Sequence, residues 1–142
     1  MEKILLTLSS NSPKSTGTAA NFVQTLSKQY NLNNNNKYSI RLISGVIPNS
    51  VLQSTGFYIT ADIVAVGEVN GRSDFVLYTH GKELPTYNQS NVIQLESYDN
   101  DCKLLDKSFS TINVKVKNLD GTPFECDVEG VSTITIEFVQ LT

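Results

Sequence analysis

The chain has 142 residues, a length that suits one domain with its own hydrophobic core. No segment contains the run of about 18 apolar residues that a membrane-spanning helix needs, so no membrane span is expected. The formal net charge is −3 and no segment is markedly basic, so nucleic acid is not expected to be the main partner. The apolar stretch 4–8 is too short for the central region of a signal peptide, so synthesis in the cytoplasm or nucleus is expected.

Alternation of apolar and polar residues is the dominant pattern, and it is typical of strands with one wet face. In chain order, the predicted strands are 2–8, 21–27, 37–46, 57–66, 74–79, 92–97, 109–117 and 132–140, with a short piece at 124–128. Residues 91–97 could also form a single helical turn. In the last strand, Phe138 is predicted to face the core and Thr135 the opposite side.

Polar segments and tight turns separate these strands. Residues 9–20, 31–36 and 80–91 are predicted as loops. Asn70-Gly71 predicts a hairpin, because a type I′ turn needs positive φ at both central residues, and Asp120-Gly121 predicts another. About eight short strands indicate a two-sheet sandwich or a small barrel, and the long loops favour the crossings of a Greek-key sandwich.

Residues that could catalyse a reaction or hold a metal are few and scattered. The single histidine, His80, has no accompanying nucleophile motif, so it is predicted to be an exposed loop residue. Cys102 and Cys126 form no CxxC pair, and two free thiols are expected, with a bridge between them left open. One histidine and two distant cysteines do not make a zinc ligand set. The chain is therefore expected to be no enzyme and to need no cofactor or metal.

Two stretches carry recognisable motifs. Residues 38–50 read YSIRLISGVIPNS, an alternating strand that runs into the corner Pro48-Asn49-Ser50. Residues 112–124 read INVKVKNLDGTPF, in which Asp120-Gly121 and Pro123 join two alternating segments. Both stretches resemble the single jelly-roll penton or minor capsid proteins of polinton-like viruses, virophages and related double-stranded DNA viruses.

Further segments extend this resemblance over about half of the chain. Residues 22–26 are similar to the short N-terminal strand of those proteins, and residues 134–138 to the strand that closes them. At the corner, Pro48 lacks an N–H and is expected to end strand pairing. Asn49 and Ser50 are expected to hold the corner through side-chain hydrogen bonds.

The resemblance implies an all-β fold, a single jelly roll built as an eight-stranded antiparallel β-sandwich over residues 1–142. It also implies a structural protein of the virion, made in the host cytoplasm or nucleus. The expected partners are further copies of the chain, as a homopentamer at the capsid vertex, and the major capsid protein. The chain has no room for the second domain that many family members carry in a loop, so no role of such an insertion is expected.

Two alternatives stay open. One is a homotrimeric fibre head or another minor capsid jelly roll, which would differ from the first interpretation in oligomer order. The other is a lectin-like carbohydrate-binding module, in which Tyr58, Tyr78, Tyr87 or Tyr98 would stack on sugar rings. Packing on strand faces is the competing explanation for those tyrosines, since tyrosine is common in strands.

Overall fold

The structure, a computed structural model, describes residues 3–32, 38–51, 56–81, 84–85, 90–96, 102–103, 107–126 and 129–140. Within these ranges the chain forms strands, turns and bends and contains no helix, so the all-β prediction is confirmed. The segment that could have been a helical turn is a strand over Val92–Leu95. Since the described ranges hold no helix, they also hold none able to cross a membrane.

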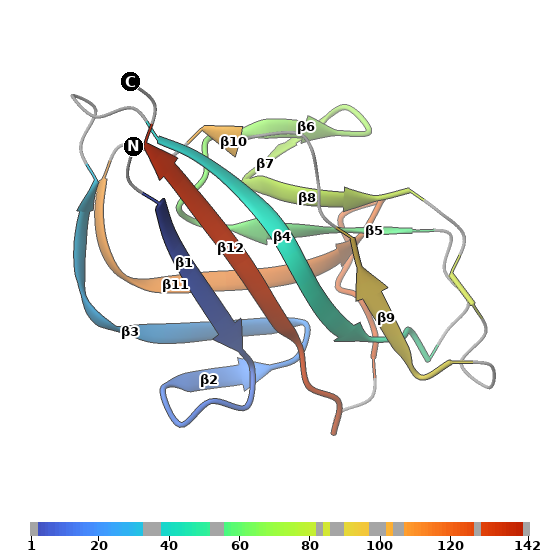
Figure 1. Cartoon of the computed structure of the whole chain (residues 1–142). Helices are drawn as coiled ribbons and strands as arrows, with labels where there is room; N and C mark the ends of the chain where they lie inside the picture. Colours follow the sequence, from blue (N-terminus) through green and yellow to red (C-terminus); the bar gives the residue numbers. More distant parts are fainter. Residues whose placement is uncertain are drawn as a thin grey trace.

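Two antiparallel sheets make up most of the molecule (Figure 1). The first follows the order β1 (Lys3–Ser9), β12 (Thr133–Gln140) and β4 (Tyr38–Pro48), with β9 (Val92–Leu95) and β10 (Cys102–Lys103) both paired with β4. The second follows the order β2 (Ser15–Thr18), β3 (Asn21–Leu32), β11 (Lys107–Asn118), β5 (Phe57–Ala61) and β8 (Val76–His80). A separate hairpin consists of β6 (Gly67–Val69) and β7 (Arg72–Asp74).

The strand order is that of a jelly roll. β9 and β10 together act as one interrupted strand beside β4, and the short strands β2, β6 and β7 are additions to the frame. The remaining strands then form two four-stranded sheets, with the order β1-β12-β4-β9/β10 in one sheet and β3-β11-β5-β8 in the other. This arrangement of eight strands in two Greek keys is the jelly-roll fold, which confirms the predicted fold class.

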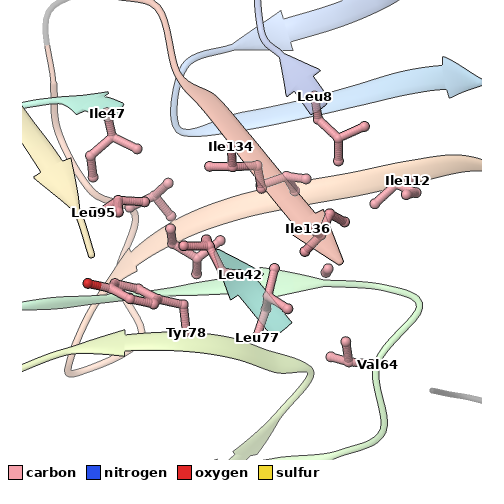
Figure 2. Packing of buried hydrophobic residues seen from close by; sticks show 14 of the residues in the cluster. Leu8, Leu42, Ile47, Val64, Leu77, Tyr78, Leu95, Ile112, Ile134 and Ile136 are labelled. Carbon is pink, nitrogen blue, oxygen red and sulfur yellow. The ribbon is translucent and has the colours of Figure 1, made fainter. Parts of the chain in front are cut away.

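The core lies between the two sheets, and the alternation of the sequence explains it. Figure 2 shows Leu42 and Ile136 of the first sheet together with Leu77 and Ile112 of the second, and all four are fully buried. Phe138 is 0% exposed whereas Thr135 is half-buried, so the predicted register of β12 is confirmed. Each strand that crosses this layer contributes every second side chain to the core because successive side chains point to opposite faces.

Two predictions in the N-terminal part of the chain, one for a loop and one for a strand, are wrong in extent. The predicted loop 9–20 contains β2, a short edge strand whose exposed polar side chains gave no alternation to detect. The predicted strand 21–27 continues to Leu32, because the ring of Tyr30 stacks on Phe109 of β11 at 5.7 Å and pairing extends beyond it. Of the predicted loop 31–36, the first two residues belong to β3 and the rest lies outside the described residues.

The segment after β5 also differs from its prediction. The alternating run 57–66 ends as a strand at Ala61, where the Val64 N–H donates to the Ala61 carbonyl and turns the chain. Asn70 and Gly71 have the φ values 51° and 78°, so the predicted turn is confirmed. It joins the three-residue strands β6 and β7, however, and not the longer strands expected on either side.

Candidate functional site

The corner that follows β4 is held by Asn49, whose side chain is 0% exposed. Its Nδ2 donates to the carbonyl oxygens of Pro85 and Ser90, both at 2.8 Å, and its Oδ1 accepts the Ser50 N–H at 2.8 Å. The Asn49 N–H donates to the Asn91 carbonyl. The predicted role of Asn49 is therefore confirmed, and its bonds tie the end of β4 to the segment that enters β9.

The turn that follows β11 is held by Asp120 and Gly121. The Asp120 carboxylate accepts the Thr122 N–H at 2.9 Å and the Thr122 hydroxyl at 2.6 Å, and these two bonds lower the pKa of Asp120. Gly121 has a φ of 88°, a conformation that favours glycine, and its N–H donates to the Asn118 carbonyl. Pro123 then forms an isolated bridge with Lys117.

The structure brings these two motifs to the same end of the sandwich. Ser50 forms an isolated antiparallel bridge with Cys126, and the Val51 N–H donates to the Glu125 carbonyl at 3.1 Å. Phe124, just before this contact, is buried with its ring 5.4 Å from that of Phe57. The predicted strand 124–128 is thus replaced, over its described part, by single bridges to the corner, because the chain leaves β11 to pack there.

The prediction for His80 is wrong. His80 is the last residue of β8 and half-buried, and its ring stacks on Phe57, its cross-strand partner, at 4.8 Å. Its Nδ1 lies 3.0 Å from the Tyr78 hydroxyl. Pairing and stacking on β5 extend the strand one residue past its predicted end, and these contacts give the imidazole a packing role.

The other residues considered in the sequence are the two cysteines, four tyrosines and possible metal ligands. Cys126 is half-buried, whereas the side chain of Cys102 lies outside the described part of the chain. Tyr58 and Tyr78 are only 3% and 4% exposed and cannot offer a ring face to a sugar, while Tyr87 and Tyr98 fall outside the described residues. The described residues contain no group of three or more His, Cys, Asp and Glu side chains that could hold a metal ion.

A polar trio on the outer face of the second sheet, in which Tyr58 is buried and Asp74 and Lys117 are half-buried, was not predicted from the sequence. The Tyr58 hydroxyl and the Lys117 ammonium both donate to Asp74 Oδ2, at 2.9 and 2.8 Å. Burial, together with the bond to Asp74, raises the pKa of Tyr58 to about 12. Burial of Asp74 favours its neutral form, but hydrogen bonds from Lys117 and from a backbone N–H outweigh that cost and lower the pKa of its carboxyl group.

This trio fixes the β6–β7 hairpin onto β5 and β11. Each of the three polar groups has a partner, so the arrangement anchors the hairpin and does not present a reactive group. In the sequence, Tyr58 and Lys117 lie on the predicted polar faces of their strands, and no local pattern links them to Asp74. The outer face of β5 is consequently buried as well, which its alternating sequence did not indicate.

The strand order and the joined motifs define the class to which the chain belongs, a single jelly-roll domain. No protein-family model matches the chain, and no curated protein sequence matches it. Among solved structures, the chain is similar to the mavirus penton protein, with a TM-score of 0.47 and 13% sequence identity. The match covers 63% of this chain and 35% of the mavirus protein, so this chain corresponds to only about a third of that protein.

Proposed function

We propose that this chain is a non-enzymatic structural protein of a virion, the penton protein at the vertices of an icosahedral double-stranded DNA virus or virus-like element. It acts by forming a homopentamer and by contacting the major capsid protein around each vertex. The observation that supports this proposal is the jelly-roll frame in which Pro48-Asn49-Ser50 and Asp120-Gly121-Thr122-Pro123, the motifs that resemble penton proteins, lie at the same end, with the corner bridged to the segment that follows the second motif.

The composition of the surface is compatible with such an assembly. Charged residues make up 18% of the chain, against about 25% in an average domain, and the centres of protein interfaces are poor in charge. Exposed large apolar side chains among the described residues lie on strands and turns of both sheets: Leu5, Val23, Val46, Val51, Val66, Phe75, Val92 and Val131.

The oligomer order tests the proposal. We would measure the mass of the purified protein by light scattering over a series of concentrations, and image the same sample by electron microscopy. The expected result is a particle of five times the chain mass with five-fold symmetry. A trimer would favour the fibre-head alternative instead, and a monomer at every concentration would contradict the penton proposal.

A further inference from the structure

A pocket of about 370 Å³ opens on the side of the sandwich where β1 and β3 lie next to each other (Figure 1). The apolar part of its lining comes from Leu6 and Leu8 of β1 and from Leu26 and Tyr30 of β3, and Lys14 also lines it. The ring of Tyr30 is held in place because it stacks on the ring of Phe109. Polar residues, among them Thr7, Gln24 and Thr25, also line it, so the pocket is a recess of mixed character. Its volume is large enough to receive a side chain of another molecule.

The strand beside this pocket has an open edge. The Ser10 N–H donates to the Ser132 carbonyl, and among the described strands β1 pairs only with β12, so the N–H and C=O groups of Lys3, Leu5 and Thr7 point away from the sheet. The equivalent groups of Ser9 are satisfied by side chains of the same chain. No hydrogen bond among the described residues does this for Lys3, Leu5 and Thr7, and the Leu5 side chain is 59% exposed.

Charge is divided between the two sides of the molecule. We call the side with β1, β2 and β3 the basic side, because residues 3–32 contain Lys3, Lys14 and Lys28, all exposed, and no acidic residue. The acidic side is formed by β9 and by the turn after β11, where Glu96 and Glu125 are exposed. Residues 118–131 contain no lysine or arginine, although the guanidinium of Arg72 lies against Gly121 in this turn. β1 and β9 are opposite edges of one sheet, so the two sides face away from each other.

The acidic side also carries an apolar projection. Val51 is 49% exposed and its N–H donates to the Glu125 carbonyl, so an exposed valine lies next to the backbone of Glu125, whose side chain is also exposed. The basic side offers a pocket whose lining includes apolar side chains and a lysine. The two sides are therefore complementary both in charge and in apolar surface.

We propose that copies of this chain associate head to tail, with the acidic side of one copy docked on the basic side of the next. Val51 and Glu125 of one copy then enter the pocket between β1 and β3 of the next copy, where the Glu125 carboxylate pairs with the Lys14 ammonium group. This proposal rests on the homo-oligomer of the proposed function and names its contact. Because the two surfaces differ, the contact is heterologous and repeats around a ring until the ring closes.

Charge reversal tests the contact. Lys14→Glu combined with Lys28→Glu should weaken self-association about tenfold or more, and Glu125→Lys should act in the same direction. Lys14→Glu combined with Glu125→Lys in one chain should restore part of the lost association, because the pair is rebuilt with the charges exchanged. Glu68→Lys, on the exposed face of β6 and outside both sides, is the matched control. Sedimentation velocity gives the association, and circular dichroism checks that each variant is folded.

The outcomes separate this contact from the proposed function. A pentamer that is weakened by charge reversal and recovered by the exchange supports both. A pentamer whose association is unchanged by every charge reversal overturns the proposed contact but remains consistent with the penton proposal. A charge-sensitive trimer supports the contact and contradicts the vertex role. A dimer would mean that two identical surfaces meet and would overturn the head-to-tail contact, and a chain that stays monomeric overturns both proposals.

Discussion

Replacing Phe138 by alanine removes a central side chain of the core. Phe138 is 0% exposed, its strand partners are Ile4 and Ile40, and its ring lies 6.0 Å from that of Phe109. Neighbours on both adjacent strands and on the other sheet hold their places through their own pairing, so the cavity cannot close. We expect Phe138→Ala to lower the free energy of unfolding by about 3–5 kcal/mol.

Urea denaturation followed by circular dichroism measures this loss. With an m-value of about 2 kcal/mol per molar urea, a loss of about 4 kcal/mol lowers the midpoint by about 2 M. Phe138→Leu, which keeps most of the volume, should cost less than about 1.5 kcal/mol and remains measurable if the alanine variant does not fold.

The matched control lies three residues earlier in β12. Thr135 is half-buried on the opposite face, and its hydroxyl meets the exposed Thr7 hydroxyl at 3.0 Å. Thr135→Ala should therefore cost less than about 1 kcal/mol, since a hydrogen bond exposed to water contributes little. Equal losses for Phe138→Ala and Thr135→Ala would refute the assigned register or show that both faces of β12 are buried alike.

Three further predictions concern the corner, the polar trio and the β2–β3 connection. Asn49→Ala leaves the carbonyls of Pro85 and Ser90 without their donor and should cost about 1–3 kcal/mol in urea denaturation. The pKa of Asp74 is lowered by folding, so its carboxylate stabilises the protein above about pH 4, and this contribution is lost as the pH falls through the folded pKa. The stability difference between the wild type and Asp74→Asn should shrink accordingly in acid. Gly17→Ala should destabilise strongly, because Gly17 has a φ of 120° and a Cβ there would collide with the Asn21 backbone.

Each of these has its own control. Asn49→Asp keeps the hydrogen bond from the Ser50 N–H but loses the two donated bonds. If it lowered the free energy of unfolding as little as a substitution at an exposed position does, the two donated bonds would not be what holds the corner. A stability difference for Asp74→Asn that stays constant from neutral pH into acid would show that the ionised carboxylate is not what anchors the hairpin. Gly71→Ala has a positive φ but open space around the added Cβ, so it should cost only about 1 kcal/mol, and a loss as large as that of Gly17→Ala would contradict the predicted collision.

Features with a local cause could be predicted from the sequence. Burial of Ile40, Leu42 and Phe138 follows from a period of two residues, which every strand with one apolar face must show. The turn at Asn70-Gly71 follows from the tolerance of these residues for positive φ. Even the uneven distribution of charge, with three lysines and no acid over residues 3–32, is visible in the printed sequence.

Features with a non-local cause became visible only in the tertiary structure. β2 pairs through its backbone, so its side chains carried no signal, and His80 joined a strand because Phe57 lies opposite it. The trio of Tyr58, Asp74 and Lys117 forms across three strands that no short pattern connects.

The sequence by itself thus determined which faces of the strands are apolar and where the tight turns lie, because both depend on neighbouring residues. The tertiary structure decided that the corner after β4 meets the segment that follows the turn at Asp120-Gly121, with Ser50 beside Cys126. It also placed the lysines of 3–32 and the carboxylate of Glu125 on opposite sides of the sandwich. The physical reason is that strand order arises from long-range pairing, whose free energy depends on the whole core and not on any single segment.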